Sequence, residues 1–373
     1  MTIALKEITS LKDLRAFIRF PLSLYRNHPC YVPALFVDDY ETLRRDKNPA
    51  FEDCQARYWM AYRDNVPVGR IAAILNRKHI EKWNQPYMRF SWFDFIDDPA
   101  VPEALLETVE NWAREEGMEA VHGPLGFTDL DREGMLVEGF NELATLSTFY
   151  NYPYYPQHMA RLGYVKDIDW MEYEISMPAE PPETIAKAAG IVAKRYGLKL
   201  LEVKKKKELL AYAPELFEIL NEEYQHLYGT VPLSKKQVDL YIRQYFGFIT
   251  PDFVPIVVDG NGKMIAFGIT LPSLSRALQK GRGELLPFGF LHLLKALRKN
   301  DRADLYLVAI RKEYQGRGVN ALLMMKMFEV FRKMGIQKIE TNPELETNQA
   351  VQTQWKYFDK RQHKRRRIFI KRI

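Results

Sequence analysis

The apolar pattern of this chain repeats one order of strands and helices on either side of a proline-rich break. The break lies at residues 176–184, where three prolines in nine residues disfavour a continued helix or a central strand. On each side the order is strand, helices, antiparallel strands, helix, strand, helix, strand. This order predicts an α/β fold with a mixed sheet, built twice. A chain of 373 residues is also long for one core, so we predict two domains, residues 1–177 and 178–373.

Turn residues locate the antiparallel strands within each half. Asp64-Asn65 separates two apolar β runs in the first half, and residues 259–262, Asp-Gly-Asn-Gly, do the same in the second. Both turns are typical of β-hairpins. Residues 283–300 interrupt the repeated order, and we interpret them as an inserted helical segment.

The composition argues against several classes of protein. Cys30 and Cys54 are the only cysteines, which implies no disulfide framework and fits a reducing compartment. The first residues lack the regions of a signal peptide, and no run of about 18 apolar residues predicts a membrane span. The seven histidines show no paired-ligand spacing, so we expect no metal. These features predict a cytoplasmic protein without a membrane partner.

The net charge of +6 comes from the last 14 residues, which hold eight Lys or Arg and no acid. Without them the chain has 46 basic and 48 acidic residues. Residues 363–373, HKRRRIFIKRI, end in β-branched and aromatic residues, so we predict a terminal strand at an exposed sheet edge, kept soluble by its charges. The alternative is a contact with an anion, either a cofactor phosphate or RNA.

A glycine-containing loop, YQGRGVNALL at residues 314–323, lies between an apolar β run and a helical pattern. Free amides at a helix N-terminus attract anions. Gly316 and Gly318 lack Cβ atoms and let phosphate oxygens approach the backbone, while Lys312 and Arg317 offer positive charge. The spacing alone is equally compatible with a simple strand-to-helix turn.

Residues 310–323, IRKEYQGRGVNALL, closely resemble motif A of the GNAT superfamily of acyl-CoA N-acyltransferases. Gln315, Gly318 and Asn320 fall on the fixed positions of that motif, although Asn320 replaces the usual small residue. Residues 346–358, ETNQAVQTQWKYF, resemble the later helix of the family, with Asn348 on its asparagine. The repeated order resembles two GNAT domains in tandem across the whole chain.

The resemblance implies a site for acetyl-CoA or another acyl-CoA as co-substrate, and transfer of the acyl group, most simply acetyl, to a small-molecule or peptide amine. The implied cofactor-binding residues are Val308, Ile310, Gln315, Gly316, Arg317, Gly318, Val319, Asn320 and Asn348. A carboxylate would serve as base, and Glu340 is the candidate, against the alternative of a solvated carboxylate at a strand end. Trp355 stands where the family often has a proton-donating tyrosine. The nearby Tyr357 is the candidate acid, although it would point to another side of a helix.

The first half lacks the glycine loop at the equivalent place. It has Asp97-Asp98-Pro99 there, and carboxylates can cap the helix start themselves and repel a pyrophosphate. We therefore predict a degenerate copy that binds no coenzyme A. The polar residues 123–140, with Asp129, Asp131 and Glu133, are interpreted as a surface loop, with a cationic-amine or metal site as the alternative.

Two other functions stay open on the sequence alone. One is a non-catalytic GNAT-fold binding or sensing module, favoured by Trp355, Asn320 and the acidic first half. The other is an aminoacyl-tRNA-using transferase similar to Fem-type enzymes, which also pair two GNAT-like domains. The basic C-terminal segment would suit tRNA, but the intact loop from Gln315 to Asn320 favours coenzyme A. We therefore do not expect a nucleic-acid partner.

Overall fold

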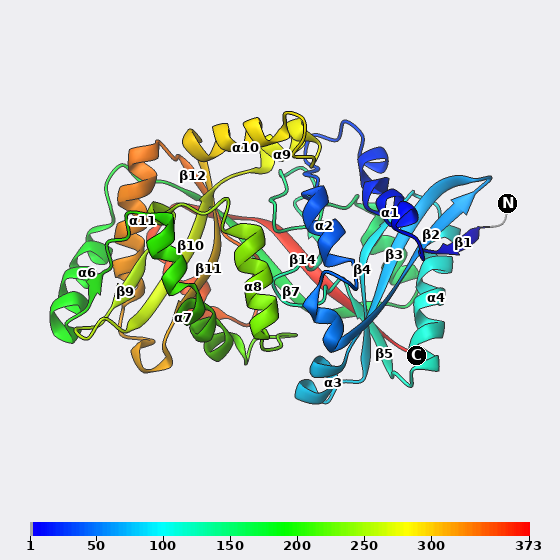
Figure 1. The fold of residues 1–373 in the computed structure, drawn as a ribbon, viewed down its shortest axis with the longest axis horizontal. Coiled ribbons are helices and arrows are strands. Elements are labelled where there is room, and N and C mark those ends of the chain that lie inside the picture. Colours follow the sequence, from blue (N-terminus) through cyan, green and yellow to red (C-terminus); the bar gives the residue numbers. More distant parts are fainter. Residues whose placement is uncertain (1–2) are drawn as a thin grey trace.

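The chain folds around one continuous mixed sheet with helices on both of its faces (Figure 1). The computed structural model describes residues 3–373. The strands of the first half are β1 (Ala4–Glu7), β2 (Cys54–Arg63), β3 (Val66–Asn76), β4 (Tyr87–Phe95), β5 (Ala120–Gly123), β6 (Met135–Glu138) and β7 (Val165–Ser176). Those of the second half are β8 (Lys199–Leu200), β9 (Ile256–Val258), β10 (Met264–Pro272), β11 (Arg302–Ile310), β12 (Lys338–Glu340), β13 (Glu344–Leu345) and β14 (Lys360–Arg372).

Helices follow the predicted order in both halves. In the first half they are α1 (Leu11–Leu24), α2 (Phe36–Thr42), α3 (Arg77–Trp83), α4 (Ala100–Glu115) and α5 (Tyr154–Arg161). In the second half they are α6 (Glu183–Tyr196), α7 (Lys206–Tyr224), α8 (Lys235–Tyr245), α9 (Ser275–Gly281), α10 (Gly289–Arg298), α11 (Asn320–Met334) and α12 (Gln349–Thr353). Within residues 3–373, no helix has both the length and the apolar character that a bilayer span needs.

Local sequence signals account for these elements. The hairpin between β2 and β3 turns at Asp64 and Asn65, which adopt φ of 48° and 64°, as residues of a type I′ turn do. Leu105, Val109 and Trp112 recur at helical spacing and bury one face of α4 in the core of the first half, because such spacing places them on one side of the helix.

The strand order is β1-β2-β3-β4-β5-β14-β7-β12-β11-β10-β9-β8. The last strand of the chain, β14, lies between β5 and β7 of the first half, while β7 pairs with β12 of the second. The two halves therefore exchange their final strands, and the predicted break between separate sheets at residue 177 is wrong. Apolar clusters form on both sides of that position, but others contain residues of both halves; one of these joins Tyr173 and Ile175 to α11. The division into domains 1–177 and 178–373 stays a prediction.

The position of β14 corrects the prediction of an exposed edge strand. β14 pairs with β7 on one side and with β5 and β6 on the other, and its Lys364 and Arg366 are buried. Both contact the buried Glu172, at 3.1 Å from Lys364 Nζ and 2.6 Å from Arg366 Nε. Further along, Lys371 pairs with Glu110 at 2.9 Å. The basic residues were predicted to be exposed because their carboxylate partners are distant in the sequence.

The two halves repeat one local arrangement. β4 pairs with β5 in parallel only over Tyr87–Arg89, and β11 pairs with β12 in parallel only over Arg302–Asp304. Beyond Asp304 the pairing of β11 with β12 ends, whereas in the first half the Leu125 amide still donates to the Phe90 carbonyl at 2.9 Å. In each half a helix, α4 or α11, follows the first of the two strands. The second copy of this arrangement forms the site described next.

Candidate functional site

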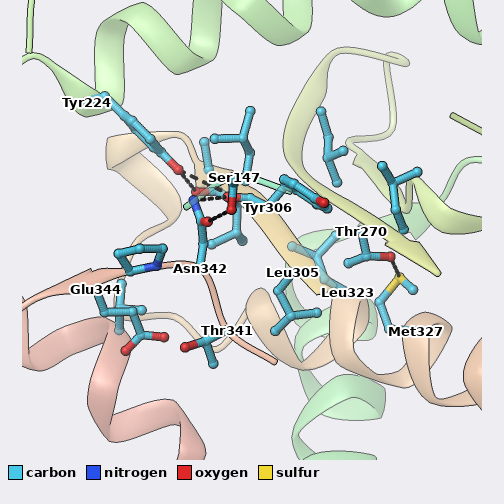
Figure 2. Close-up of a pocket in the computed structure, with 18 of the residues that line it drawn as sticks. Ser147, Tyr224, Thr270, Leu305, Tyr306, Leu323, Met327, Thr341, Asn342 and Glu344 are labelled. Carbon is cyan, nitrogen blue, oxygen red and sulfur yellow. Dashed lines mark hydrogen bonds between the residues drawn. The ribbon is translucent and has the colours of Figure 1, made fainter. Parts of the chain in front are cut away.

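A cavity of about 1090 Å³ lies where β11 and β12 separate. Its wall contains residues 305–310 of β11 and residues 341–345 beyond β12, together with residues of α7, α8 and α11. The first half contributes Ser147 and the segment from Asp129 to Glu133. Figure 2 shows polar groups gathered at one side and Leu305, Leu323 and Met327 at another. Both halves of the chain therefore build this cavity.

The glycine loop forms the part of the wall at the start of α11. Gly316 and Gly318 adopt φ of 69° and 81°, a region that residues with a Cβ rarely enter. Val319 precedes the helix and makes no side-chain cap. Among the described residues, the amides of Gly318, Val319 and Asn320 have no hydrogen-bond acceptor. The loop thus presents three free donors at the positive end of a helix, as an anion site requires.

Two of the predicted ligand residues brace this loop, and Gln315 also lines the cavity. Gln315 Nε2 donates to the Ile310 carbonyl at 2.9 Å and to Glu223 Oε2 at 2.6 Å. The Arg317 guanidinium lies over the rings of Tyr196 and Tyr314, 5.2 and 5.8 Å from their centroids. Arg317 is absent from the residues that line the cavity, although Gly316 and Gly318 beside it belong to the wall.

Beyond Asp304, β11 has no paired strand on its β12 side among residues 3–373, and side chains hydrogen-bond its backbone carbonyls there. The Tyr224 hydroxyl donates to the Val308 carbonyl at 3.0 Å. Asn342 Nδ2 donates to the Tyr306 carbonyl at 3.2 Å, and Ser147 Oγ donates to Asn342 Oδ1 at 2.8 Å (Figure 2). Val308 and Ile310 both lie in the cavity wall, and the Val308 carbonyl is occupied by the Tyr224 hydroxyl. No motif in the sequence indicated Tyr224, Ser147 or Asn342.

Glu344 is a carboxyl group of the cavity wall that the sequence reasoning missed. Trp355 Nε1 donates to its Oε1 at 2.7 Å, while its Oε2 is buried without a hydrogen-bond partner among residues 3–373. Burial raises the pKa of Glu344 to about 7, more than the Trp355 hydrogen bond lowers it. A carboxyl group with a pKa near neutrality exchanges protons readily. Trp355 thus holds in place a carboxyl group whose pKa is near neutrality.

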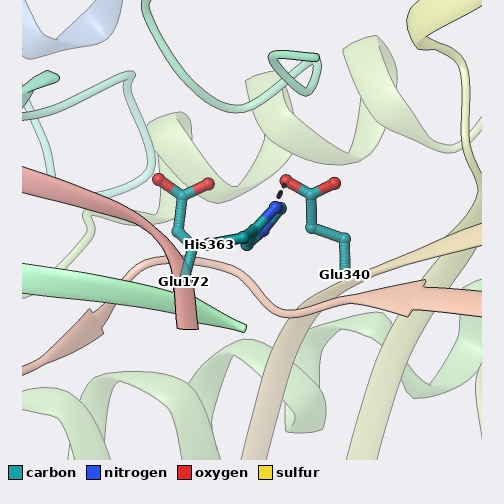
Figure 3. A group of neighbouring side chains, drawn as sticks. All are labelled: Glu172, Glu340 and His363. Atoms are coloured by element: carbon teal, nitrogen blue, oxygen red, sulfur yellow. Dashed lines mark ion pairs between the residues drawn. The ribbon is translucent and has the colours of Figure 1, made fainter. Parts of the chain in front are cut away.

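Glu340 occupies a different environment from the one expected. It is buried and does not belong to the cavity wall. Lys364 donates to both Glu340 and Glu172, and His363 Nε2 lies 3.5 Å from Glu340 Oε1 (Figure 3). Glu340 is therefore not the solvated strand-end carboxylate of the alternative interpretation. Glu172, Glu340 and His363 lie close enough to hold a cation, but the Lys364 ammonium already bridges the two carboxylates.

The acidic segment from Asp129 to Glu133 is not a surface loop, which corrects the sequence interpretation. Asp129, Asp131 and Glu133 all line the cavity. Burial raises the pKa of Asp129 and of Asp131 to about 6, and raises that of Glu133 further above its ordinary value. Asp131 Oδ2 accepts from the Phe127 amide at 2.7 Å, whereas Asp129 Oδ1 has no partner among the described residues.

The remaining predicted residues fall at the rim of the site or outside it. Asn348 lines the cavity and caps α12, because its Oδ1 accepts from the Val351 amide at 3.3 Å. Tyr357 also lines the cavity and is 47% exposed. In the first half Asp98 Oδ1 accepts from the Ala100 amide at 3.0 Å. A carboxylate thus occupies the helix start that corresponds to the glycine loop.

Comparisons with known proteins agree with this geometry. Residues 213–353 match the model of the Acetyltransferase (GNAT) family. The second half thus contains a segment of the GNAT family, and the whole chain has the fold of tandem GNAT proteins. A tandem GNAT protein from the clavulanic acid biosynthesis pathway aligns with 100% of this chain and 98% of its own, at a TM-score of 0.55 and 12% identity. A GCN5-related N-acetyltransferase from Sphaerobacter thermophilus aligns with 99% of this chain and 95% of its own, at a TM-score of 0.53 and 12% identity.

Two bacterial proteins resemble nearly the whole sequence. Protein YghO of Escherichia coli strain K12 is 29% identical over 97% of this chain and 93% of its own length. The bacterial ceramide synthase of Caulobacter vibrioides is 25% identical over 91% of this chain and 89% of its own length. Members of the GNAT family are generally acyltransferases, so an acyltransferase fold is established for this chain.

Proposed function

We propose that this protein is an acyl-CoA-dependent N-acyltransferase. The observation that carries the proposal is one cavity that joins the free amides at the start of α11 to the unpaired edge of β11. Three free amides at a helix N-terminus suit a diphosphate. The strand edge next to them suits the amides of a pantetheine arm, which hydrogen-bond as a partner strand would. These two features together fit coenzyme A better than a free anion.

We further propose that the acyl group is longer than acetyl. Beyond the strand edge, the wall of the cavity is apolar and contains Leu305, Leu323, Met327, Phe328 and Phe331. An acetyl group would leave most of this surface without a ligand contact. A longer chain would gain about 0.8 kcal/mol for each methylene that it buries there. The relative named bacterial ceramide synthase supports this choice, because a ceramide carries an N-linked acyl chain.

For the acceptor we propose a lipid amine, on the same resemblance. The first half lines the cavity with Asp129 and Glu133, and a carboxylate there would attract an ammonium group. Asp129 has an oxygen without a partner for this purpose. The degenerate first half would then bind the acceptor, while the second half binds the acyl donor.

In the proposed reaction the bound ammonium group first loses a proton to solvent, and the neutral amine nitrogen then attacks the thioester carbonyl carbon. The new C–N bond forms, the C–S bond breaks, and the sulfur leaves as a thiolate. Glu344 takes the proton from the nitrogen, directly or through water, and the Tyr357 hydroxyl or a water protonates the thiolate. Glu344 is a better candidate base than Glu340, because Glu344 lines the cavity and Glu340 is paired with Lys364.

The test measures free thiol released from acetyl-CoA, octanoyl-CoA and palmitoyl-CoA, each with small amines, a peptide amine and a long-chain amino alcohol. We expect release that depends on the amine, is fastest with a long-chain donor, and is accompanied by an N-acyl product in mass spectra. Binding of coenzyme A without thiol release for any pair would instead support a non-catalytic binding module. The variants Glu344→Gln and Glu340→Gln, assayed side by side, distinguish the two candidate bases.

A further inference from the structure

An exposed apolar patch covers the segment before α10 and the outer side of that helix. It consists of the exposed side chains Leu286, Phe288, Phe290, Leu291 and Leu294, and we call it the α10 patch. Leu286 and Phe288 are 77% and 68% exposed. On α10 the exposed residues share one arc of the helix, while Leu293 on the opposite arc packs into the core. Folded proteins rarely expose large apolar side chains in such a group without a partner.

The α10 patch is surrounded by positive charge. Residues 275–300 contain six Lys or Arg and a single acid, Glu284, which pairs with Arg19 at 2.7 Å. Within residues 3–373, most of these basic side chains have no carboxylate partner within 4 Å, namely Lys280, Arg282, Lys295, Arg298 and Lys299. All five are exposed. The segment thus combines unburied apolar groups with uncompensated basic groups.

We propose that the α10 patch docks this protein on the surface of an anionic lipid bilayer. An amphipathic helix with Phe and Leu on one side and Lys and Arg beside them is the form that lies in the plane of a membrane interface. Anionic headgroups complement the basic side chains, and each Lys or Arg near the surface strengthens binding about fivefold. Lysine is depleted at protein–protein interfaces, whereas three lysines flank this patch, which favours lipid over a protein partner.

The position of the patch connects it to the cavity. α9 and α10 run along one edge of the molecule beside α2 (Figure 1). The Gly283 carbonyl, in the turn between α9 and α10, accepts from the amide of Phe36 at the start of α2 at 2.9 Å. Ala34 and Leu35, next to Phe36, belong to the cavity wall. A bilayer contact at α10 would therefore bring the cavity close to molecules that reside in the membrane. The sequence predicted no membrane partner because it lacks a spanning run and signal-peptide regions, neither of which a helix lying on the bilayer surface needs.

The test is flotation of the full chain with vesicles of phosphatidylcholine, with and without about one third phosphatidylglycerol. We expect binding to the anionic vesicles, and weaker binding at about 0.5 M salt than at about 0.05 M. The triple variant Leu286→Ser, Phe288→Ser and Leu291→Ser should lower the partition coefficient at least tenfold. Charge reversal by Lys295→Glu, Arg298→Glu and Lys299→Glu should do the same for anionic vesicles.

The matched control is a triple variant at exposed apolar residues elsewhere, Leu11→Ser, Val66→Ser and Ile191→Ser, which should bind vesicles as the parent does. Thermal unfolding and coenzyme A binding check that each variant is folded. Three results would overturn the proposal: no flotation of the parent, equal loss in the control variant, or a dimer in light scattering that the α10 variants abolish. The last result would assign the patch to a second copy of this chain. Because coenzyme A binding is measured separately, failure of docking leaves the proposed activity intact.

Discussion

Replacing Gly318 with aspartate should abolish most of the affinity for coenzyme A. The new carboxylate would stand beside the amides of Val319 and Asn320 and accept from them, as Asp98 accepts from the Ala100 amide in the first half. A hydrogen bond to a charged group contributes about 1.5–3 kcal/mol. The variant would lose one or two such hydrogen bonds between the loop and a phosphate, and its carboxylate would repel the phosphate. Together these effects should weaken the binding free energy by about 2–4 kcal/mol. We therefore expect coenzyme A to bind about 30- to 1,000-fold more weakly, measured by titration calorimetry.

Backbone strain needs its own control, because Gly318 has a φ of 81°. Gly335, at the opposite end of α11, has a φ of 83°, and a Cβ there would meet nothing within 4 Å. Gly335→Ala and Gly318→Ala should both lower the free energy of unfolding by about 1–2 kcal/mol. Only the change at Gly318 should weaken the binding of coenzyme A. If Gly318→Asp binds as tightly as the parent, or Gly335→Ala loses as much affinity, the loop is not the diphosphate site.

Three further outcomes are expected. Glu344→Gln should lower kcat by about 10²- to 10⁴-fold. Because the base must be ionised and its pKa is raised to about 7, the kcat of the parent should fall as the pH drops through about 7, and a pH–rate profile of the variant should lack this fall. Lys364→Met leaves the buried Glu340 without its lysine, and Glu172 with Arg366 alone, and should cost about 3–5 kcal/mol of unfolding free energy in denaturant titrations. Lys187→Met, which breaks an exposed pair, should change it by less than about 1 kcal/mol. Met327→Trp narrows the apolar part of the cavity and should lower kcat/KM for palmitoyl-CoA at least tenfold relative to acetyl-CoA, while equal effects on both donors would contradict a long-chain site.

Local signals in the sequence predicted the parts of the fold that short segments determine. The hairpin at Asp64-Asn65 and the strand–loop–helix around Gly318 both depend on residues that tolerate positive φ, and such residues are recognisable in a sequence. The GNAT resemblance lay in the same short segment and gave the fold of the whole chain. The glycine loop lines a cavity, and its role as a coenzyme A site stays a prediction.

Long-range pairing was not predictable in the same way. β14 has the composition of an edge strand, and nothing nearby in the sequence shows that Glu172 and Glu110, 194 and 261 residues from their basic partners, will neutralise it. The acids at Asp129 and Glu133 resembled a polar surface loop because the second half, which covers them, is remote in sequence. Glu344 gave no signal either, since its raised pKa comes from burial and not from its neighbours along the chain.

The strand exchange makes the first half part of the framework of the site, although that half lacks a glycine loop. β14 pairs with β5 of the first half, and β7 lies between β14 and β12. Strands of both halves therefore hold β12 in place beside β11. The buried Lys364 on β14 bonds Glu172 on β7 and Glu340 on β12. These three strands therefore have one charge-compensated arrangement, because a shift of β14 would leave a buried carboxylate unpaired. The cavity opens directly beyond Glu340, and Ser147 of the first half reaches Asn342 in its wall. The first half thus contributes to the site in two ways: its β7 pairs with β12, and its Ser147 hydrogen-bonds Asn342.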